Sequence, residues 1–181
     1  GALLAESLDY ERTLARVGEL AVRGIADLCI IDLIADDRSI MRLCVTCSDA
    51  SAQAACDTLR TIQVDSDRPH LLQRVIREQQ PVLLSEPSDA QIAAMAQDAQ
   101  HLAALHAVGI RSMVGVPLIA QGQLLGGMAL LSTRSGRLYG AADVRLAEEL
   151  ARRAALSIAN ARLYQAAQEA SRARDDVLGV V

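Results

Sequence analysis

The sequence contains no Phe and no Trp, and its only aromatic side chains are three Tyr. A ligand pocket in such a protein must be lined mainly by aliphatic, Met, His and Cys side chains, because rings that could stack on a planar ligand are nearly missing. Hydrophobic residues nevertheless make up 51% of the 181 positions, which is enough for a sizeable core. The length suits one α/β domain with a flanking helix.

An excess of basic residues is also missing. The formal net charge is -4, and Arg residues are scattered among Asp and Glu, so we expect no nucleic-acid partner. The apolar run from Leu28 to Ala35 is interrupted by Asp32 and is far shorter than the roughly 20 residues of a membrane span, which predicts no membrane contact. No secretory signal follows Gly1, so the cytoplasm is the expected location, and the lack of an initial Met indicates a segment of a longer chain.

Cysteine is scarce. Cys29, Cys44, Cys47 and Cys56 lie in or near apolar segments, which predicts buried thiols in a reducing compartment. Cys44 and Cys47 have C-x-x-C spacing, but residues three apart on a strand point to opposite faces. No second Cys or His pair follows at zinc spacing, so we predict no metal site.

The periodicity of apolar residues and the turn signals predict an α/β (α+β) fold, with an antiparallel sheet of about five to six strands and helices on both faces. The strands are expected at 28–35, 40–47, 82–85, 112–120 and 124–132, the last two joined by a turn at Gln121-Gly122-Gln123. Helices are expected from an Asp9 cap to Gly24, at 50–60, from Pro69 to Pro81, at 88–107, and from a first turn holding Asp143 to Val181.

Three stretches together resemble a GAF domain of bacterial PAS/GAF-type sensor histidine kinases. They are Ser7-Leu8-Asp9-Tyr10-Glu11 leading to Ala26-Asp27-Leu28-Cys29, Gly109-Ile110-Arg111-Ser112 to Val116-Pro117-Leu118 with Leu125-Gly126, and Leu150-Ala151 to Asn160-Ala161-Arg162-Leu163-Tyr164. The resemblance implies a helix start or linker at 1–8, a GAF domain at 9–155 and a signalling helix at 156–181.

The tail from Arg172 to Val181 resembles the run that enters the dimerisation and phosphoacceptor domain of those kinases. It implies a parent protein-histidine kinase that uses ATP and phosphorylates a response regulator. No G-x-S-x-G, H-E-x-x-H or paired-carboxylate arrangement is present, so the segment itself is predicted to be non-catalytic.

Other GAF chemistries remain as alternatives, namely a stand-alone cofactor protein that binds haem or a cyclic nucleotide, or a small-molecule reductase. The residues after the last strand differ from the pattern of cyclic-nucleotide-binding members at Thr133, Arg134 and Val144. We expect Tyr139 and Asp143 to close a strand-to-helix turn instead. A reductase would need paired thiols, yet no Cys occurs from Asp57 to Val181.

Two histidines resemble cofactor positions of the family. His101 resembles the His of bilin-binding members, but Gln97 occupies the place of their chromophore Cys, which excludes a covalent bilin there. His106 is displaced by one residue from the axial position of haem-binding members, a rotation of about 100° on a helix. No cofactor is predicted, and we expect each His→Ala variant to cost about 1 kcal/mol or less, as at a surface or rim position.

A pocket is expected between the sheet and the helix at 88–107. Its lining residues either contact an unidentified small molecule or simply pack in the core. The candidates are Met95, His101, Leu102, Leu105, Ser112 and Val114.

Two apolar stripes run along the C-terminal helix. Leu146, Leu150, Ala154 and Ile158 are expected to pack on the sheet. Beyond them an a/d heptad pattern predicts a parallel homodimer through a coiled coil. Its members are Leu156, Leu163, Ala170 and Val177 at one position, and Ala159, Ala166, Ala173 and Val180 three residues later.

Overall fold

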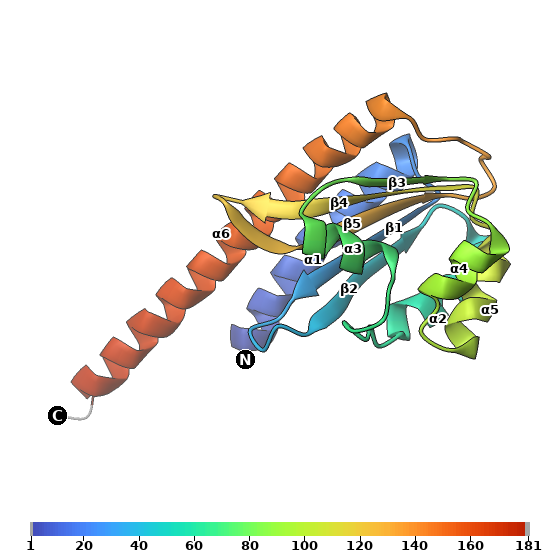
Figure 1. Ribbon diagram of the computed structural model, residues 1–181. Helices are drawn as coiled ribbons and strands as arrows, with labels where there is room; N and C mark the ends of the chain where they lie inside the picture. The colour runs from blue at the N-terminus through green and yellow to red at the C-terminus, as the bar shows by residue number, and fades with distance from the viewer. Residues whose placement is uncertain (1, 180–181) are drawn as a thin grey trace.

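The computed structural model describes residues 2–179, with side chains from residue 11 onward. One antiparallel sheet has the strand order β2-β1-β5-β4-β3, with helices on both faces (Figure 1). The strands are β1 (Leu28–Ile34), β2 (Ile40–Cys47), β3 (Val82–Ser85), β4 (Ser112–Ala120) and β5 (Gln123–Ser132). The helices are α1 (Ala2–Gly24), η1 (Ala50–Ala52), α2 (Gln53–Thr61), α3 (Leu71–Glu78), α4 (Asp89–Met95), α5 (Ala99–Val108) and α6 (Ala141–Gly179). The expected fold class is confirmed.

The turn between β4 and β5 is the one that the sequence predicts. Gln121 and Gly122 both have positive φ, 52° and 74°, between the paired residues Ala120 and Gln123. Two consecutive positive φ values suit a two-residue hairpin turn, and Gly reaches that conformation without steric cost. The hairpin prediction is confirmed.

One face of the sheet is covered by α1 and α6, which pack against each other as well as on the strands (Figure 1). Their core is apolar and rich in Ala. Tyr139 closes its end, since the buried hydroxyl donates a hydrogen bond of 2.7 Å to the Ile25 carbonyl. Asp143 accepts a hydrogen bond from the Gly140 N–H at the start of α6, so the predicted strand-to-helix closure is confirmed.

Two predictions about these helices are wrong. Asp9 lies inside α1 and does not cap it, because Ala2-Leu3-Leu4-Ala5-Glu6 are strong helix formers that continue the helix toward the N-terminus. On α6, Leu146 is 44% exposed, whereas Ala147 and Ala151 face the core together with the predicted Ala154 and Ile158. Leu150 is partly buried and packs against the same core, as predicted. The close approach of α6 to the sheet requires small side chains at its centre, which explains the inward Ala147 and Ala151.

The opposite face carries α2, α3, α4 and α5. The single helix expected at 88–107 is interrupted after Met95. Asp98 caps α5 by accepting the His101 N–H at 2.7 Å, and His101 Nδ1 accepts the Gln97 N–H at 3.0 Å. These local side-chain bonds compete with a continuous helix, which explains the break.

The cysteines follow the expected faces but not the expected state. Cys44 packs against the core under α1 and α6, and Cys47 against the core on the other face. Cys47 is joined to Cys56 of α2 by a disulfide with a Cα–Cα separation of 6.7 Å, within bonding reach. The prediction of four free thiols is therefore wrong for this pair, while Cys29 and Cys44 are free.

Among residues 2–179, none of the helices combines the length and the apolar character that crossing a bilayer requires.

Candidate ligand cavity

A buried ion pair lies on the face of the sheet that α2 to α5 cover. Asp32 of β1 is completely buried, and Arg42 of β2 binds its two carboxylate oxygens through Nε at 2.9 Å and Nη2 at 3.1 Å. Arg42 Nη1 also donates to the Leu59 carbonyl of α2 at 3.1 Å. The register shift of the β1–β2 ladder falls between Ile31 and Asp32, where a bulge re-aims a side chain. The ion pair therefore holds two opposite charges in the interior, and the bond from Arg42 to Leu59 connects the edge strand β2 to α2.

His70 enters the same interior from the start of α3. It is the N-cap residue, and its Nδ1 accepts the Gln73 N–H at 3.2 Å. An Nδ1 that accepts a hydrogen bond leaves the proton of a neutral imidazole on Nε2. Within the part of the chain that the structure describes, this Nε2 is buried and has no hydrogen-bond partner.

His101 reaches the interior from α5. Its Nδ1 accepts the Gln97 N–H, so its proton also lies on Nε2. The residue is only 6% exposed, which makes the expectation of a rim position wrong. We therefore expect its truncation to cost more than a surface substitution.

Both imidazoles are neutral at physiological pH. Burial lowers the pKa of His70 to about 4, an effect that the nearby Asp32 opposes and the nearby Arg42 reinforces. Burial likewise lowers the pKa of His101 to about 4, again reinforced by Arg42. Each ring thus acts as a neutral hydrogen-bond donor through Nε2.

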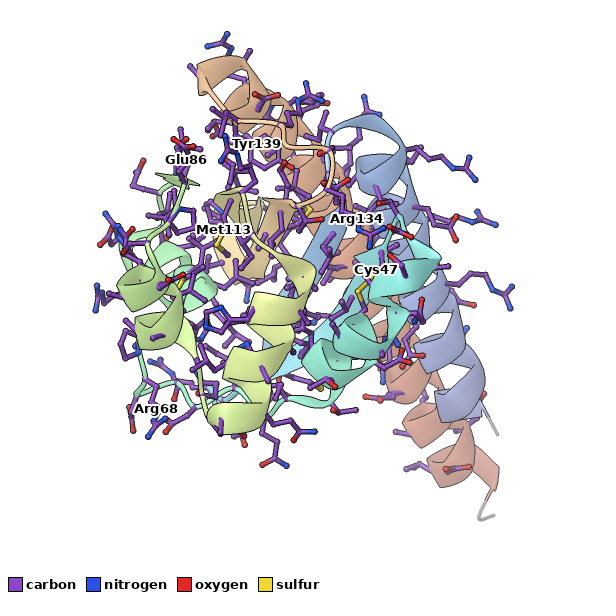
Figure 2. All side chains as sticks on the ribbon, turned by 90° about the vertical axis from the view of Figure 1, so that its right-hand side faces the viewer. Cys47, Arg68, Glu86, Met113, Arg134 and Tyr139 are labelled. Carbon is purple, nitrogen blue, oxygen red and sulfur yellow. A yellow bond between two sulfur atoms is a disulfide. The ribbon has the colours of Figure 1, made fainter. Side chains whose placement is uncertain are left out.

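Arg42, His70 and His101 line a cavity of about 40 Å³ between the sheet and the helices. Met113 of β4 lies on this side of the sheet (Figure 2). The three named polar side chains meet an otherwise apolar wall. That wall consists of Ile30, Leu71, Leu72, Met95, Leu105, Met113, Ala129 and Leu131.

A wider groove of about 250 Å³ adjoins this cavity between α3 and α4. The linings of the two have His70, Leu71 and Met95 in common. Arg74 and Arg77 of α3 lie along the outer groove. Met95, which lines both the cavity and the groove, has a flexible side chain.

The structure brings three of the six predicted pocket residues to the cavity: Met95, His101 and Leu105. Leu102 packs on the same core without lining it. Ser112 accepts the Tyr139 N–H at 3.1 Å, and Val114 lies in the core under α1 and α6. Ser112 and Val114 were misassigned for one reason: side chains alternate along β4, and the residue that faces the cavity is Met113.

Sequence reasoning missed Arg42 and His70. The interruption of an apolar strand by Asp32 was the available signal, because a buried carboxylate requires a cationic partner. His70 stands directly before the apolar stretch of α3, where a capping residue is expected. Neither signal indicates that Arg42 and His70 line the same cavity, because the two residues belong to separate elements.

The residues of the alternative chemistries are placed apart from the cavity. His106 is exposed on α5, Arg134 pairs with Asp49 at 2.8 Å, and no cysteine lines either the cavity or the groove. Burial raises the pKa of Cys29 and Cys44, the opposite of what a reactive thiol requires. The inner cavity is also far too small for a tetrapyrrole or a nucleotide.

No group of three His, Cys, Asp or Glu side chains that could hold a metal ion occurs among the described residues.

The match to known families decides the identity of the fold. The GAF domain family matches residues 7–159, which is most of the chain. The chain belongs to the GAF domain family. Among curated protein sequences, none matches it significantly.

Solved structures share this GAF fold at low sequence identity. A GAF domain/HD domain protein from Geobacter sulfurreducens has a TM-score of 0.65 and 18% identity, covering 88% of this chain and 98% of that one. Residues 122 to 287 of a methyl-accepting chemotaxis protein give 0.65 and 17%, covering 91% and 98%. A domain named as part of a two-component sensor histidine kinase protein from Sinorhizobium meliloti 1021 gives 0.60 and 15%, covering 87% and 97%. These likenesses show the fold of the chain.

Proposed function

We propose that this GAF module senses a signal and relays it, as a parallel homodimer, through α6 to a histidine kinase domain that phosphorylates a response regulator. The similarity to a domain named as part of a sensor histidine kinase protein supports this output, and so does the kinase-like tail from Arg172 onward. The module itself performs no catalysis in this scheme. We also propose a cytoplasmic location for the module.

The observation that carries the proposal is the apolar stripe on the projecting part of α6. The helix extends well past the sheet (Figure 1), and beyond Ile158 none of its described residues is buried. Leu156, Leu163 and Val177 are 49%, 60% and 74% exposed. Such a stripe on a lone helix leaves apolar surface in water, and seven-residue spacing suits a second identical helix.

The other members of the heptad fit the same arrangement. Ala159 is half-buried where α6 leaves the sheet, so the paired region would begin next to the folded core. The remaining members are exposed, except for Val180, which lies outside the described residues. They are Ala166, Ala170 and Ala173.

The test is Leu163→Glu, which would place two carboxylates against each other in the seam. Multi-angle light scattering should show the wild type as a dimer and the variant shifted toward monomer. Leu178→Glu is the matched control, because Leu178 is 67% exposed on the same helix but lies off the heptad positions. The control should remain dimeric, and the thermal melts of all three proteins should agree.

A wild-type monomer at high concentration, or equal dissociation by both variants, would contradict the dimer. The kinase output is tested separately by the coding sequence beyond Val181. A His-containing box followed by an ATP-binding domain would support it, and a stop codon would contradict it.

A further inference from the structure

The inner cavity has an unbalanced hydrogen-bonding inventory. Its polar side chains are Arg42, His70 and His101, and all three present donors. Arg42 has five N–H groups, and its bonds to Asp32 and Leu59 use three of them among the described residues. No side chain in the lining offers a carboxylate, amide or hydroxyl oxygen. The occupant that suits this lining is therefore an acceptor.

His70 presents the donor that an occupant of the cavity would satisfy. Its Nε2–H is buried and unpaired in the described structure. Leaving a buried donor unsatisfied destabilises the folded state. The ring cannot rotate away without losing the Nδ1 bond that caps α3. The free donor is thus held in place by the fold.

A water molecule fits this lining poorly. It could accept from His70, but its own two O–H groups would find no side-chain acceptor, and buried water typically makes about three hydrogen bonds. A carboxylate has only acceptors and bonds well to a guanidinium. The Asp32 charge, which would repel an anion, is already balanced by Arg42.

Resting on the proposed sensory function, we infer that this cavity binds a short-chain carboxylate. One oxygen accepts from His70 Nε2–H, and the free N–H groups of Arg42 and His101 Nε2–H hold the carboxylate further. The cavity of about 40 Å³ holds little more than that group. The alkyl part would therefore displace Met95 and extend toward the groove beside α3 and α4.

The variant that isolates this role is His70→Asn. The Asn side-chain oxygen can still cap α3, because Asn is among the preferred N-cap residues, but the ring Nε2–H is removed. His106→Asn is the matched control, since His106 is an exposed His outside the cavity. Retention of the wild-type circular dichroism spectrum by both variants shows that each still folds.

The probes are sodium propionate and neutral propionamide, each titrated at constant ionic strength into the 15N-histidine-labelled chain. We expect propionate to shift the His70 Nε2–H resonance and to raise the melting temperature. Half-saturation should need at least tenfold more propionate in His70→Asn, read from the melting temperature, and should be unchanged in His106→Asn.

Three results would overturn the inference. The first is no response to propionate up to about 100 mM, which corresponds to negligible affinity. The second is an equal response in His70→Asn, and the third is an equal response to propionamide. A water molecule that stays bound to His70 throughout the titration counts as no response to propionate, and it would overturn the inference as well. Because dimerisation is read by light scattering on Leu163→Glu, loss of the dimer and loss of carboxylate binding are separate outcomes.

Discussion

The two faces of the sheet are built on different principles. Under α1 and α6 the core is closed and apolar, and Ala147, Ala151, Ala154 and Ala155 bring α6 close to the strands. Under α2 to α5 the core contains a buried ion pair, two neutral imidazoles and a cavity. The two faces share β1, β4 and β5, whose alternate side chains point into one core or the other.

The difference shows how one small domain can separate rigidity from sensing. A close-packed face transmits displacement because its side chains interdigitate with few voids. A face with an unpaired donor and a cavity can change its packing when a molecule enters. Any rearrangement around Met113 or Ala129 would reach α6 through the strands that carry both cores.

The largest expected effect comes from a substitution in the polar face, which is the face of the sheet under α2 to α5. Asp32→Asn removes one partner of a buried pair and leaves the Arg42 charge uncompensated, so we expect it to lower the free energy of unfolding by about 3–5 kcal/mol. Urea denaturation followed by circular dichroism measures this loss. Asp32→Leu combined with Arg42→Met should recover much of the stability, because two apolar groups replace two charges. A double variant as unstable as Asp32→Asn would show that the pair has no electrostatic role.

The next effect concerns the apolar face. Ile158→Ala removes a side chain that is 1% exposed and should cost about 2–4 kcal/mol through the cavity it leaves. Leu156→Ala, two residues away but 49% exposed, should cost less than about 0.5 kcal/mol in the monomer. Urea denaturation at low protein concentration compares them. Similar losses in both variants would mean that α6 packs on the sheet with another face.

The smallest effect is a dependence on pH that belongs to the polar face. The folded pKa of His70, about 4, lies below its ordinary value of 6.5. Between these values the unfolded chain binds a proton that the folded chain does not, so stability is complete above pH 6.5 and falls as the pH drops toward 4. For His70 the loss at pH 5 should be about 1–2 kcal/mol, and His101 adds to it in the same direction.

Thermal melts at pH 7 and pH 5 measure this loss. His70→Asn should show a smaller difference between the two pH values than the wild type, because one titrating group is gone. An unchanged difference would show that His70 is protonated in the folded state as readily as in the unfolded one.

The sequence predicted most of the fold because its strands carry clear turn and periodicity signals. The bounds of β2, β3 and β4 agree with the structure residue for residue. The break between α4 and α5 was missed because it depends on the local bonds of Asp98 and His101, which apolar spacing does not report. On α6 the sequence misplaced Leu146 and missed the inward Ala147 and Ala151, because Ala spacing is a weak signal in an Ala-rich helix.

The site was less accessible to sequence reasoning. His101 was found through its place in the family, but Arg42 and His70 become neighbours only when β2 and α3 pack on the same face. The disulfide between Cys47 and Cys56 is another long-range contact, since the sequence showed only a C-x-x-C spacing with Cys44. Contacts between separate elements need the tertiary structure.

The central claim is that α6 pairs in parallel with a second copy, and distances between spin labels test it most directly. Single labels at Tyr164→Cys and at Ser171→Cys, both in a Cys44→Ser background, occupy equivalent positions one heptad apart. A parallel in-register dimer predicts the same interspin distance at both sites. An antiparallel pair would shift the distance by up to about 20 Å between them, since seven residues rise about 10 Å. Unequal distances, or no dipolar coupling at either site, would contradict the account.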